Sequence, residues 1–236
     1  MRVVAAAIAH NEARKIGSVL SRFPPGIVDA VLVVDDASTD GTGDVAVEQG
    51  ATVLRHEVRR GVGAAIRTAM RHAVDGSFDV LVILAGNDKD RPAEIPRLVA
   101  PIAEDRSDLV QGSRYLPGGD FGNMPAYRQI ATRWIHPLLF SLIVGRRFTD
   151  TTNGFRAIRL SMVQDPRINL SQPWLDHYEL EPYLLVTAIR AGYRVTEVPV
   201  TKIYPARHLG YTKMAPITGW WSILRPLVWL ALGVKK

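Results

Sequence analysis

The residues of this chain best suited to chemistry follow the apolar run Val31-Leu-Val-Val34. Two adjacent carboxylates, Asp35 and Asp36, come directly after the run, and the polar cluster 38–42 then begins a helix. The run has no polar alternation, which is typical of a central parallel strand covered on both faces. Ligands of open α/β sheets bind beyond the carboxyl ends of such strands. Asp36 is therefore predicted to bind the base or ribose of a nucleotide. The alternative is an ordinary turn whose side chains cap the helix.

Further polar motifs are spread along the chain. They are, in order, Ala9-His-Asn-Glu12, Gly61-Val-Gly63, Gln111-Gly-Ser-Arg114-Tyr115, Asp150-Thr-Thr-Asn153 and Glu197-Val-Pro199. In this order they resemble the motifs of the family-two glycosyltransferases, and the closest subgroup is the dolichyl- or polyprenyl-phosphate mannose and glucose synthases. The resemblance extends over about residues 2 to 213. Coincidence is a poor explanation, because several motifs occur in the family's order.

The resemblance implies both a fold and an activity. The fold is α/β of the GT-A type, in which helices flank a Rossmann-like, mostly parallel sheet. The activity is inverting transfer of a sugar from a nucleotide-diphosphate sugar, GDP- or UDP-linked, to a polyprenyl-phosphate lipid. Two alternatives stay open. One is transfer to a soluble or saccharide hydroxyl, and the other is a non-catalytic nucleotide-sugar-binding protein.

Site residues follow from the same resemblance. The positions that match donor-binding residues are Ala9, Asn11, Glu12, Asp36, Gly63 and Asn87. The catalytic candidates are Arg114, Arg128 and Asp150, and the phosphate-binding candidates are Arg128, Thr132, Arg207 and Lys213. Arg128 and Thr132 are four residues apart and so share a helix face. The alternatives are a solvated basic surface for the cations, a tight turn at Gly63 and a turn cap at Asp150.

The expected metal-binding motif is altered in this chain. The family carries Asp-x-Asp after its fourth strand, but here the apolar run 80–84 leads into Ala85-Gly86-Asn87, so both carboxylates are missing. A shifted set of oxygen atoms could bind Mg²⁺ or Mn²⁺, from Asn87, Asp88 and Asp90. The ammonium of Lys89 would partly replace the charge of a metal beside the diphosphate. Loss of the metal and a polar loop that caps the next helix are the open alternatives.

Composition excludes several classes of protein. The 236 residues fit one large α/β domain, and the absence of cysteine excludes disulfides, thiol catalysis and thiolate metal sites. The net charge of +6 suits phosphorylated substrates or anionic lipid. We expect no nucleic-acid partner, because no nucleic-acid-binding motif is found. The first residues lead straight into a strand without a signal-peptide cleavage site, and a cytoplasmic protein is expected.

Strand and helix patterns alternate through the first half of the chain, which favours a parallel sheet with right-handed crossovers. Strands are expected near 2–9, 30–35, 52–56, 79–84, 107–112 and 193–203. Helices are expected near 12–22, 41–49, 63–74, 93–103, 127–144 and 178–191. The whole of 1–213 is expected to form one catalytic domain.

The carboxyl-terminal segment 214–236 is expected to form an amphipathic helix or hairpin at the membrane interface. Its tryptophans and its terminal lysines are typical of contact with anionic headgroups. Three tryptophans are predicted at headgroup depth and three leucines deeper, namely Trp220, Trp221, Trp229, Leu224, Leu227 and Leu230. Pro226 is expected to break or kink the helix. The chain would then lie peripherally on the cytoplasmic face of the membrane. The alternative is a helix packed on the core or on a second subunit of a homo-oligomer.

Overall fold

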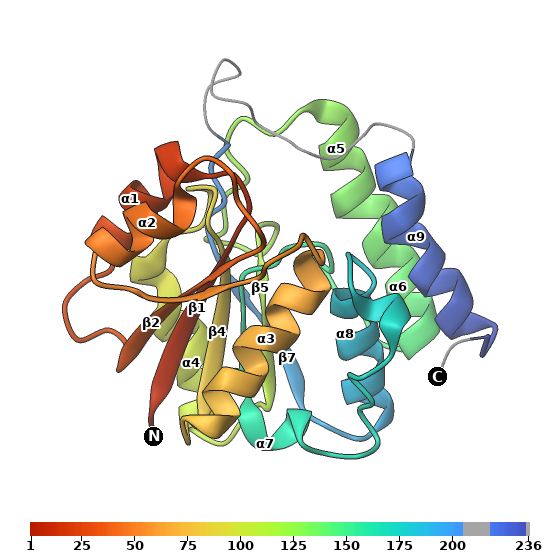
Figure 1. Cartoon of the computed structure of the whole chain (residues 1–236). Helices are drawn as coiled ribbons and strands as arrows, with labels where there is room; N and C mark the ends of the chain where they lie inside the picture. The colour runs from red at the N-terminus through yellow and green to blue at the C-terminus, as the bar shows by residue number, and fades with distance from the viewer. Residues whose placement is uncertain (205–217, 235–236) are drawn as a thin grey trace.

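The computed structural model describes residues 1–204 and 218–234, which form a sheet between two layers of helices (Figure 1). In this part of the chain seven strands form one sheet in the order β3-β2-β1-β4-β6-β5-β7. Their bounds are β1 Val3–Ala9, β2 Ala30–Asp35, β3 Thr52–Arg55, β4 Val80–Ala85, β5 Leu109–Ser113, β6 Arg156–Arg159 and β7 Val195–Pro199. The predicted, mostly parallel α/β sheet is confirmed.

One strand runs against the others. β1 pairs in parallel with β2 and β4, β2 with β3, and β5 with β7, whereas β6 is antiparallel to both β4 and β5. The carboxyl ends of the six parallel strands therefore lie at one edge of the sheet, beside the residues that precede β6. This strand was not predicted, because four residues with arginine at both ends carry no strand pattern. Its direction brings the segment 150–155 to the same edge.

Each face of the sheet is covered by its own helices. The side chains of Leu32 and Val34 point to one layer and that of Val33 to the other, so the uninterrupted apolar run does mark a strand buried on both faces. One layer holds α1 (Ala13–Ser21), α2 (Thr42–Glu48) and α4 (Ile95–Ala103), the last preceded by the 3₁₀ turn η1 (Pro92–Glu94). The other holds α3 (Val62–Asp75), α7 (Leu160–Val163) and α8 (Leu180–Arg190), with the 3₁₀ turn η3 (Pro173–Leu175) beside them.

The long helix predicted over 127–144 is found, but it is not uniform. It consists of α5 (Ala126–Ile130), a π-helical turn η2 (Ala131–Ile135) and α6 (His136–Val144). Pro137 has no N–H to donate to the preceding turn and lies just after the wide turn. Single π turns inside helices occur often at functional sites, and this one carries Thr132.

The terminal helix α9 (Thr218–Ala231) packs against α6 and α8. The prediction that Leu227 and Leu230 enter a bilayer is wrong, because both are buried in the hydrophobic core that α3, α6 and α8 share. Trp229 packs edge-on against Trp174, with ring centroids 5.8 Å apart. Nor does Pro226 divide the segment in two, since it lies inside one continuous helix. Within the two described ranges, no helix is both long and apolar enough to span a membrane.

Truncating Leu227 should show whether α9 packs on the protein core or lies outside it. The side chain is only 2 % exposed, so Leu227→Ala should lower the free energy of unfolding by roughly 2–5 kcal/mol through the cavity it leaves. Leu232, 72 % exposed on the same segment, is the matched control, and Leu232→Ala should change that free energy by less than about 0.5 kcal/mol. Urea unfolding measures both. Equal small effects would mean that α9 does not pack on this core in solution.

Candidate active site at the carboxyl edge of the sheet

The loops after β1 and β2 are joined by hydrogen bonds. The Asp36 amide donates to the Ala9 carbonyl over 2.9 Å, and the Glu12 amide donates to Thr42 Oγ1 over 2.8 Å. Asn11, in the left-handed region at φ 52°, accepts a bond from the Thr39 amide at Oδ1. The structure thus brings three predicted donor-binding residues, Ala9, Asn11 and Glu12, beside the loop that follows β2.

Asp36 itself is buried, and the protein occupies both of its oxygens. Oδ1 accepts bonds from the Arg60 amide and from His56 Nδ1, and Oδ2 accepts one from the Gly61 amide, each over 2.8 Å. Burial raises the pKa of this carboxyl, but the bonds from Arg60, His56 and Gly61 outweigh burial, so the pKa is lowered. The carboxylate predicted to bind a nucleotide therefore anchors the loop that begins α3. Its contact with a nucleotide stays a prediction.

Gly63 lies where α3 meets the segment 175–177. A Cβ at this position would be 1.9 Å from the Leu175 carbonyl oxygen and 2.6 Å from that of His177. The neighbouring Ala64 amide donates to the Asp176 carbonyl over 3.0 Å. Close packing of two backbones is thus sufficient reason for glycine here, and the donor-binding role predicted for Gly63 also stays a prediction.

The shifted acidic motif does not converge on one point. Asp88 points back to α1, where it pairs with Arg22 over 2.5 Å and accepts a bond from Ser18. Asp90 pairs with Lys202 over 2.5 Å and accepts a bond from the Ala85 amide over 2.9 Å. Asn87 Oδ1 is buried and has no hydrogen-bond partner within the described residues.

These residues do not fit a divalent metal ion. Two of the three candidate ligands, Asp88 and Asp90, are neutralised by cations on different elements. In residues 1–204 and 218–234 there is no group of three or more histidines or carboxylates that could hold a metal ion. The amide oxygen of Asn87 alone is a weak site, because Mg²⁺ and Mn²⁺ favour several oxygen ligands. The prediction that Asn87, Asp88 and Asp90 form a shifted metal site is therefore not supported by the arrangement of their side chains.

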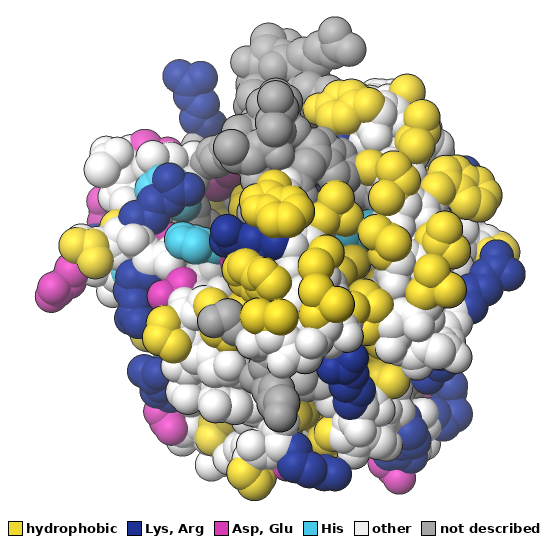
Figure 2. Space-filling view, turned by 90° about the vertical axis from the view of Figure 1, so that its right-hand side faces the viewer, with side chains coloured by type: hydrophobic (Ala, Val, Ile, Leu, Met, Phe, Trp, Pro, Cys, Tyr) yellow, Lys and Arg dark blue, Asp and Glu magenta, His cyan; other side chains and the backbone are white. Residues whose placement is uncertain are grey.

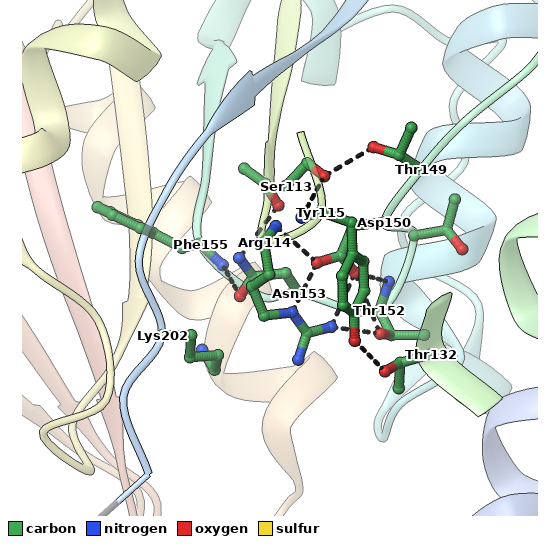
Figure 3. Close-up of polar contacts among 12 residues, drawn as sticks. Ser113, Arg114, Tyr115, Thr132, Thr149, Asp150, Thr152, Asn153, Phe155 and Lys202 are labelled. Atoms are coloured by element: carbon green, nitrogen blue, oxygen red, sulfur yellow. Dashed lines mark hydrogen bonds and ion pairs between the residues drawn. The ribbon is translucent and has the colours of Figure 1, made fainter. Parts of the chain in front are cut away.

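Arg114, at the end of β5, forms a buried ion pair with Asp150 (Figure 3). Its Nε and Nη2 donate to the two carboxylate oxygens over 2.6 and 2.8 Å, and Nη2 also donates to Thr152 Oγ1. Burial opposes the charge of Arg114, but the pairing with Asp150 raises the pKa of the guanidinium. Two predicted catalytic residues are thus brought together, and Asp150 holds Arg114 in place.

Asp150 is held in turn by Glu197 of β7. The Glu197 carboxylate accepts hydrogen bonds from the backbone amides of Thr149 and Asp150. Burial raises the pKa of Glu197, although these bonds act against that rise. Asn153 donates from its side chain to the Gly112 carbonyl over 3.0 Å, which fixes the same loop to β5. The motifs around positions 112, 150 and 197 therefore form one network.

Cations gather around the ring of Tyr204. Lys89 Nζ lies 4.8 Å from the ring centroid and Arg128 Cζ lies 5.7 Å from it. Thr132 shares a hydrogen bond of 2.6 Å with the Tyr115 hydroxyl and donates to the Arg128 carbonyl. Burial, followed by the charges of Lys202, Arg128 and Lys15, lowers the pKa of Lys89 to about 7. The position of Lys89 and Arg128 around Tyr204 favours the binding of an anionic ligand beside them.

Neither Lys202 nor Tyr204 is among the predicted site residues. Lys202 lies inside the last predicted strand, 193–203, and Tyr204 directly follows it. The observed strand β7 ends earlier, at Pro199, and is parallel to β5, so both residues come after its carboxyl end at the same edge. The predicted phosphate-binding residues Arg207 and Lys213 lie outside the described residues.

Comparison with known proteins gives the arrangement a context. The family model described as glycosyl transferase family 2 matches residues 8–165. The undecaprenyl-phosphate mannosyltransferase of Micrococcus luteus is 33 % identical over 221 residues, which cover 91 % of this chain and 88 % of that protein. The dolichyl-phosphate hexose transferase of Haloferax volcanii is 30 % identical over 226 residues, covering 94 % of this chain and 91 % of that protein.

A solved structure shares the fold. The glucosyl-3-phosphoglycerate synthase of Mycobacterium tuberculosis, in complex with Mn²⁺, UDP and phosphoglyceric acid, superimposes with a TM-score of 0.71. It is 22 % identical in sequence, and the match covers 98 % of this chain and 78 % of that one. At this identity the likeness concerns the fold alone.

Removing the charge of Asp150 should show how far the buried pair supports the fold. Asp150→Asn leaves the Arg114 charge buried and uncompensated, so the free energy of unfolding should fall by roughly 3–5 kcal/mol. Asp75→Asn, at the exposed end of α3, is the matched control and should change it by less than about 0.5 kcal/mol. Chemical denaturation followed by circular dichroism gives both values. A stable Asp150→Asn protein would mean that Arg114 has another counter-charge.

Proposed function

Because the chain belongs to glycosyl transferase family 2 and is a glycosyltransferase, we propose that it transfers a sugar from a nucleotide-diphosphate donor to a polyprenyl phosphate, with inversion at the anomeric carbon. The names of its relatives support the acceptor, since they include undecaprenyl-phosphate and dolichyl-phosphate transferases and a polyprenol monophosphomannose synthase. The donor is GDP- or UDP-linked.

The observation that carries the proposal has two parts. The carboxylates at this edge already accept hydrogen bonds or pair with cations, whereas Lys89 and Arg128 lie together at the ring of Tyr204. A hydroxyl acceptor needs a general base to remove its proton. The carboxylates of Asp36, Asp88, Asp90, Asp150 and Glu197 each accept hydrogen bonds or pair with a cation. A phosphate acceptor carries its own anionic oxygen at neutral pH, because the second pKa of a phosphate monoester is about 6. The arrangement therefore favours phosphate over a hydroxyl.

In the proposed reaction an acceptor phosphate oxygen attacks the anomeric carbon as the bond to the diphosphate breaks on the opposite side. A retaining route through a covalent intermediate would need a carboxylate nucleophile, and the bidentate pair with Arg114 occupies Asp150. Single displacement, and hence inversion, fits this arrangement better. Arg128 and Thr132, with Arg207 and Lys213, are proposed to bind phosphate. Ala9, Asn11, Glu12, Asp36, Gly63 and Asn87 are proposed to line the donor site.

An apolar surface supports a membrane-bound acceptor. Side chains on α5–α6 and α9 form this surface, which we call the apolar face (Figure 2). Its exposed members are Tyr127, Ile130, Trp134, Ile135, Leu138, Leu139, Leu142, Trp221, Val228 and Leu232. The stripe from Tyr127 to Leu142 recurs every three or four residues along one side of the helix. The exposed cations Arg133, Arg146 and Arg147 accompany it and suit anionic headgroups.

We propose that the apolar face rests on the cytoplasmic surface of the membrane. The same helix also contains Arg128, which lies near Tyr204, and Thr132, which bonds to Tyr115. The phosphate of a lipid could therefore reach the site while the lipid tail stays in the bilayer. Residues 1–213 would then be the catalytic domain, and 214–236 would contribute both a core-packed side and an exposed side of α9. This division revises the membrane contact predicted for Leu227 and Leu230.

The activity assay is release of GDP or UDP from GDP-mannose, GDP-glucose or UDP-glucose, with and without polyprenyl phosphate. Release should depend on polyprenyl phosphate and leave a glycolipid that partitions into organic solvent. Arg128→Ala should lower turnover roughly ten- to a hundredfold by removing a phosphate-binding cation, whereas Arg71→Ala, an exposed cation on α3, should not. Transfer to saccharides alone, with no response to polyprenyl phosphate, would refute the acceptor.

Charge placed on the apolar face should abolish membrane binding. The double variant Leu138→Asp with Leu142→Asp changes side chains that are 61 % and 72 % exposed, so the fold should tolerate it. In flotation with liposomes that contain anionic lipid, this variant should stay at the bottom of the gradient, whereas wild type and Val47→Asp, an exposed site on α2, should float. Flotation of the double variant would disprove this orientation. A dimer that the same variant dissociates would assign the face to a second copy instead.

A further inference from the structure

We infer that Lys89, with Arg128 beside it, supplies the positive charge that a divalent metal would otherwise supply to the departing diphosphate, so that this chain binds its donor without metal. The inference rests on the proposed nucleotide-diphosphate donor. Sugar transfer needs cationic stabilisation of the leaving group, which a metal ion or positioned Arg and Lys side chains can provide. The glucosyl-3-phosphoglycerate synthase that shares the fold was crystallised with Mn²⁺ and UDP, but the described residues of this chain form no group that fits such an ion.

Lys89 lies on the loop directly after β4, at the carboxyl edge of the sheet. Its own carbonyl accepts a hydrogen bond from the Ile203 amide over 2.9 Å, and the next residue, Asp90, forms a β-bridge with Lys202. The side chain is only 7 % exposed and lies against the ring of Tyr204. The backbone of Lys89 is therefore fixed by these contacts, and its ammonium lies against an aromatic ring. A fixed charge of this kind needs no reorganisation during the reaction.

Several charged side chains surround Lys89. Lys202, Arg128 and Lys15 lie close enough to act on Lys89, and Asp90 is the acid that acts with them. Lys202 pairs with Asp90, and Lys15 pairs with Glu12 over 2.9 Å. Burial, together with these cations, lowers the pKa of Lys89 to about 7, and an anion bound beside Lys89 would favour its protonated form. Cations held close together favour an anionic ligand, and a diphosphate is such an anion.

The same contacts explain why a metal is displaced. The Lys202 ammonium lies on the carboxylate of Asp90, and the Arg22 guanidinium lies on that of Asp88. Each cation occupies oxygens that a metal would need. Ala85 and Asn87 stand at the positions where the family has two carboxylates, and the buried Lys89 follows two residues later. We treat these differences as one change, in which fixed ammonium and guanidinium groups replace a metal ion.

Binding measurements test this without relying on turnover. The affinities of UDP and GDP are measured by isothermal titration calorimetry in EDTA and again in Mn²⁺, and those of UMP and GMP serve as a reference. Wild type should bind the preferred diphosphate with an affinity that differs by less than roughly threefold between EDTA and Mn²⁺. Lys89→Met keeps the length of the side chain and its packing on Tyr204. It should weaken diphosphate binding roughly ten- to a hundredfold and monophosphate binding much less.

Lys89→Arg retains the charge and should keep most of the affinity, and Arg71→Ala should behave like wild type. Thermal unfolding of each variant shows whether it is folded. Diphosphate binding that requires Mn²⁺, or Lys89→Met binding like wild type, would overturn the inference and leave the proposed function standing. If wild type binds neither UDP nor GDP with or without Mn²⁺, the proposed function itself fails.

Discussion

The buried ion pair between Arg114 and Asp150 is the interaction on which the site depends. It joins the end of β5 to the loop that enters the antiparallel strand β6, and Glu197 of β7 holds the same loop from the other side. Two buried charges cost more in desolvation than an isolated pair returns, unless further hydrogen bonds satisfy them. The Arg114 amide, which donates to the Asp150 carboxylate, and Thr152 Oγ1, which accepts from Arg114, complete this pair. A rigid guanidinium is thereby fixed at the carboxyl edge of the sheet.

The direction of β6 explains how distant motifs meet. If β6 ran parallel to its neighbours, the segment 150–155 would begin at the opposite edge of the sheet. Because it runs antiparallel, Asp150 and Asn153 lie beside the carboxyl ends of β4 and β5. The apolar runs and the alternation of elements predicted the parallel strands and the helices between them. They did not predict β6, since its residues are too few and too polar to show a period.

The sequence suggested candidate residues for the site at the carboxyl edge of the sheet, but it suggested few of the contacts that these residues make. Arg114 and Asp150 were each predicted as catalytic residues, but motif order did not predict that they form an ion pair. Asp36 has the expected place, yet the amides that fill its carboxylate come from a loop more than 20 residues away. Sequence could not show that Lys202 would neutralise Asp90, because that pair joins residues 112 positions apart. The burial of one side of α9 was likewise missed, since an apolar terminal helix has the same pattern whether lipid or protein covers it.

The packing of Gly63 limits how this protein could bind a phosphate. The first turn of α3 gives the Ala64 amide to the Asp176 carbonyl, and the backbone of 175–177 lies where an anion would have to approach. Many nucleotide-binding folds hold phosphates with such backbone amides, which no substitution of a side chain removes. Here the charges gathered at the edge belong to long side chains. A single amino-acid substitution can add or remove a phosphate-binding side chain of this kind. Such binding can therefore diverge among related chains while the β-sheet that supports it stays the same.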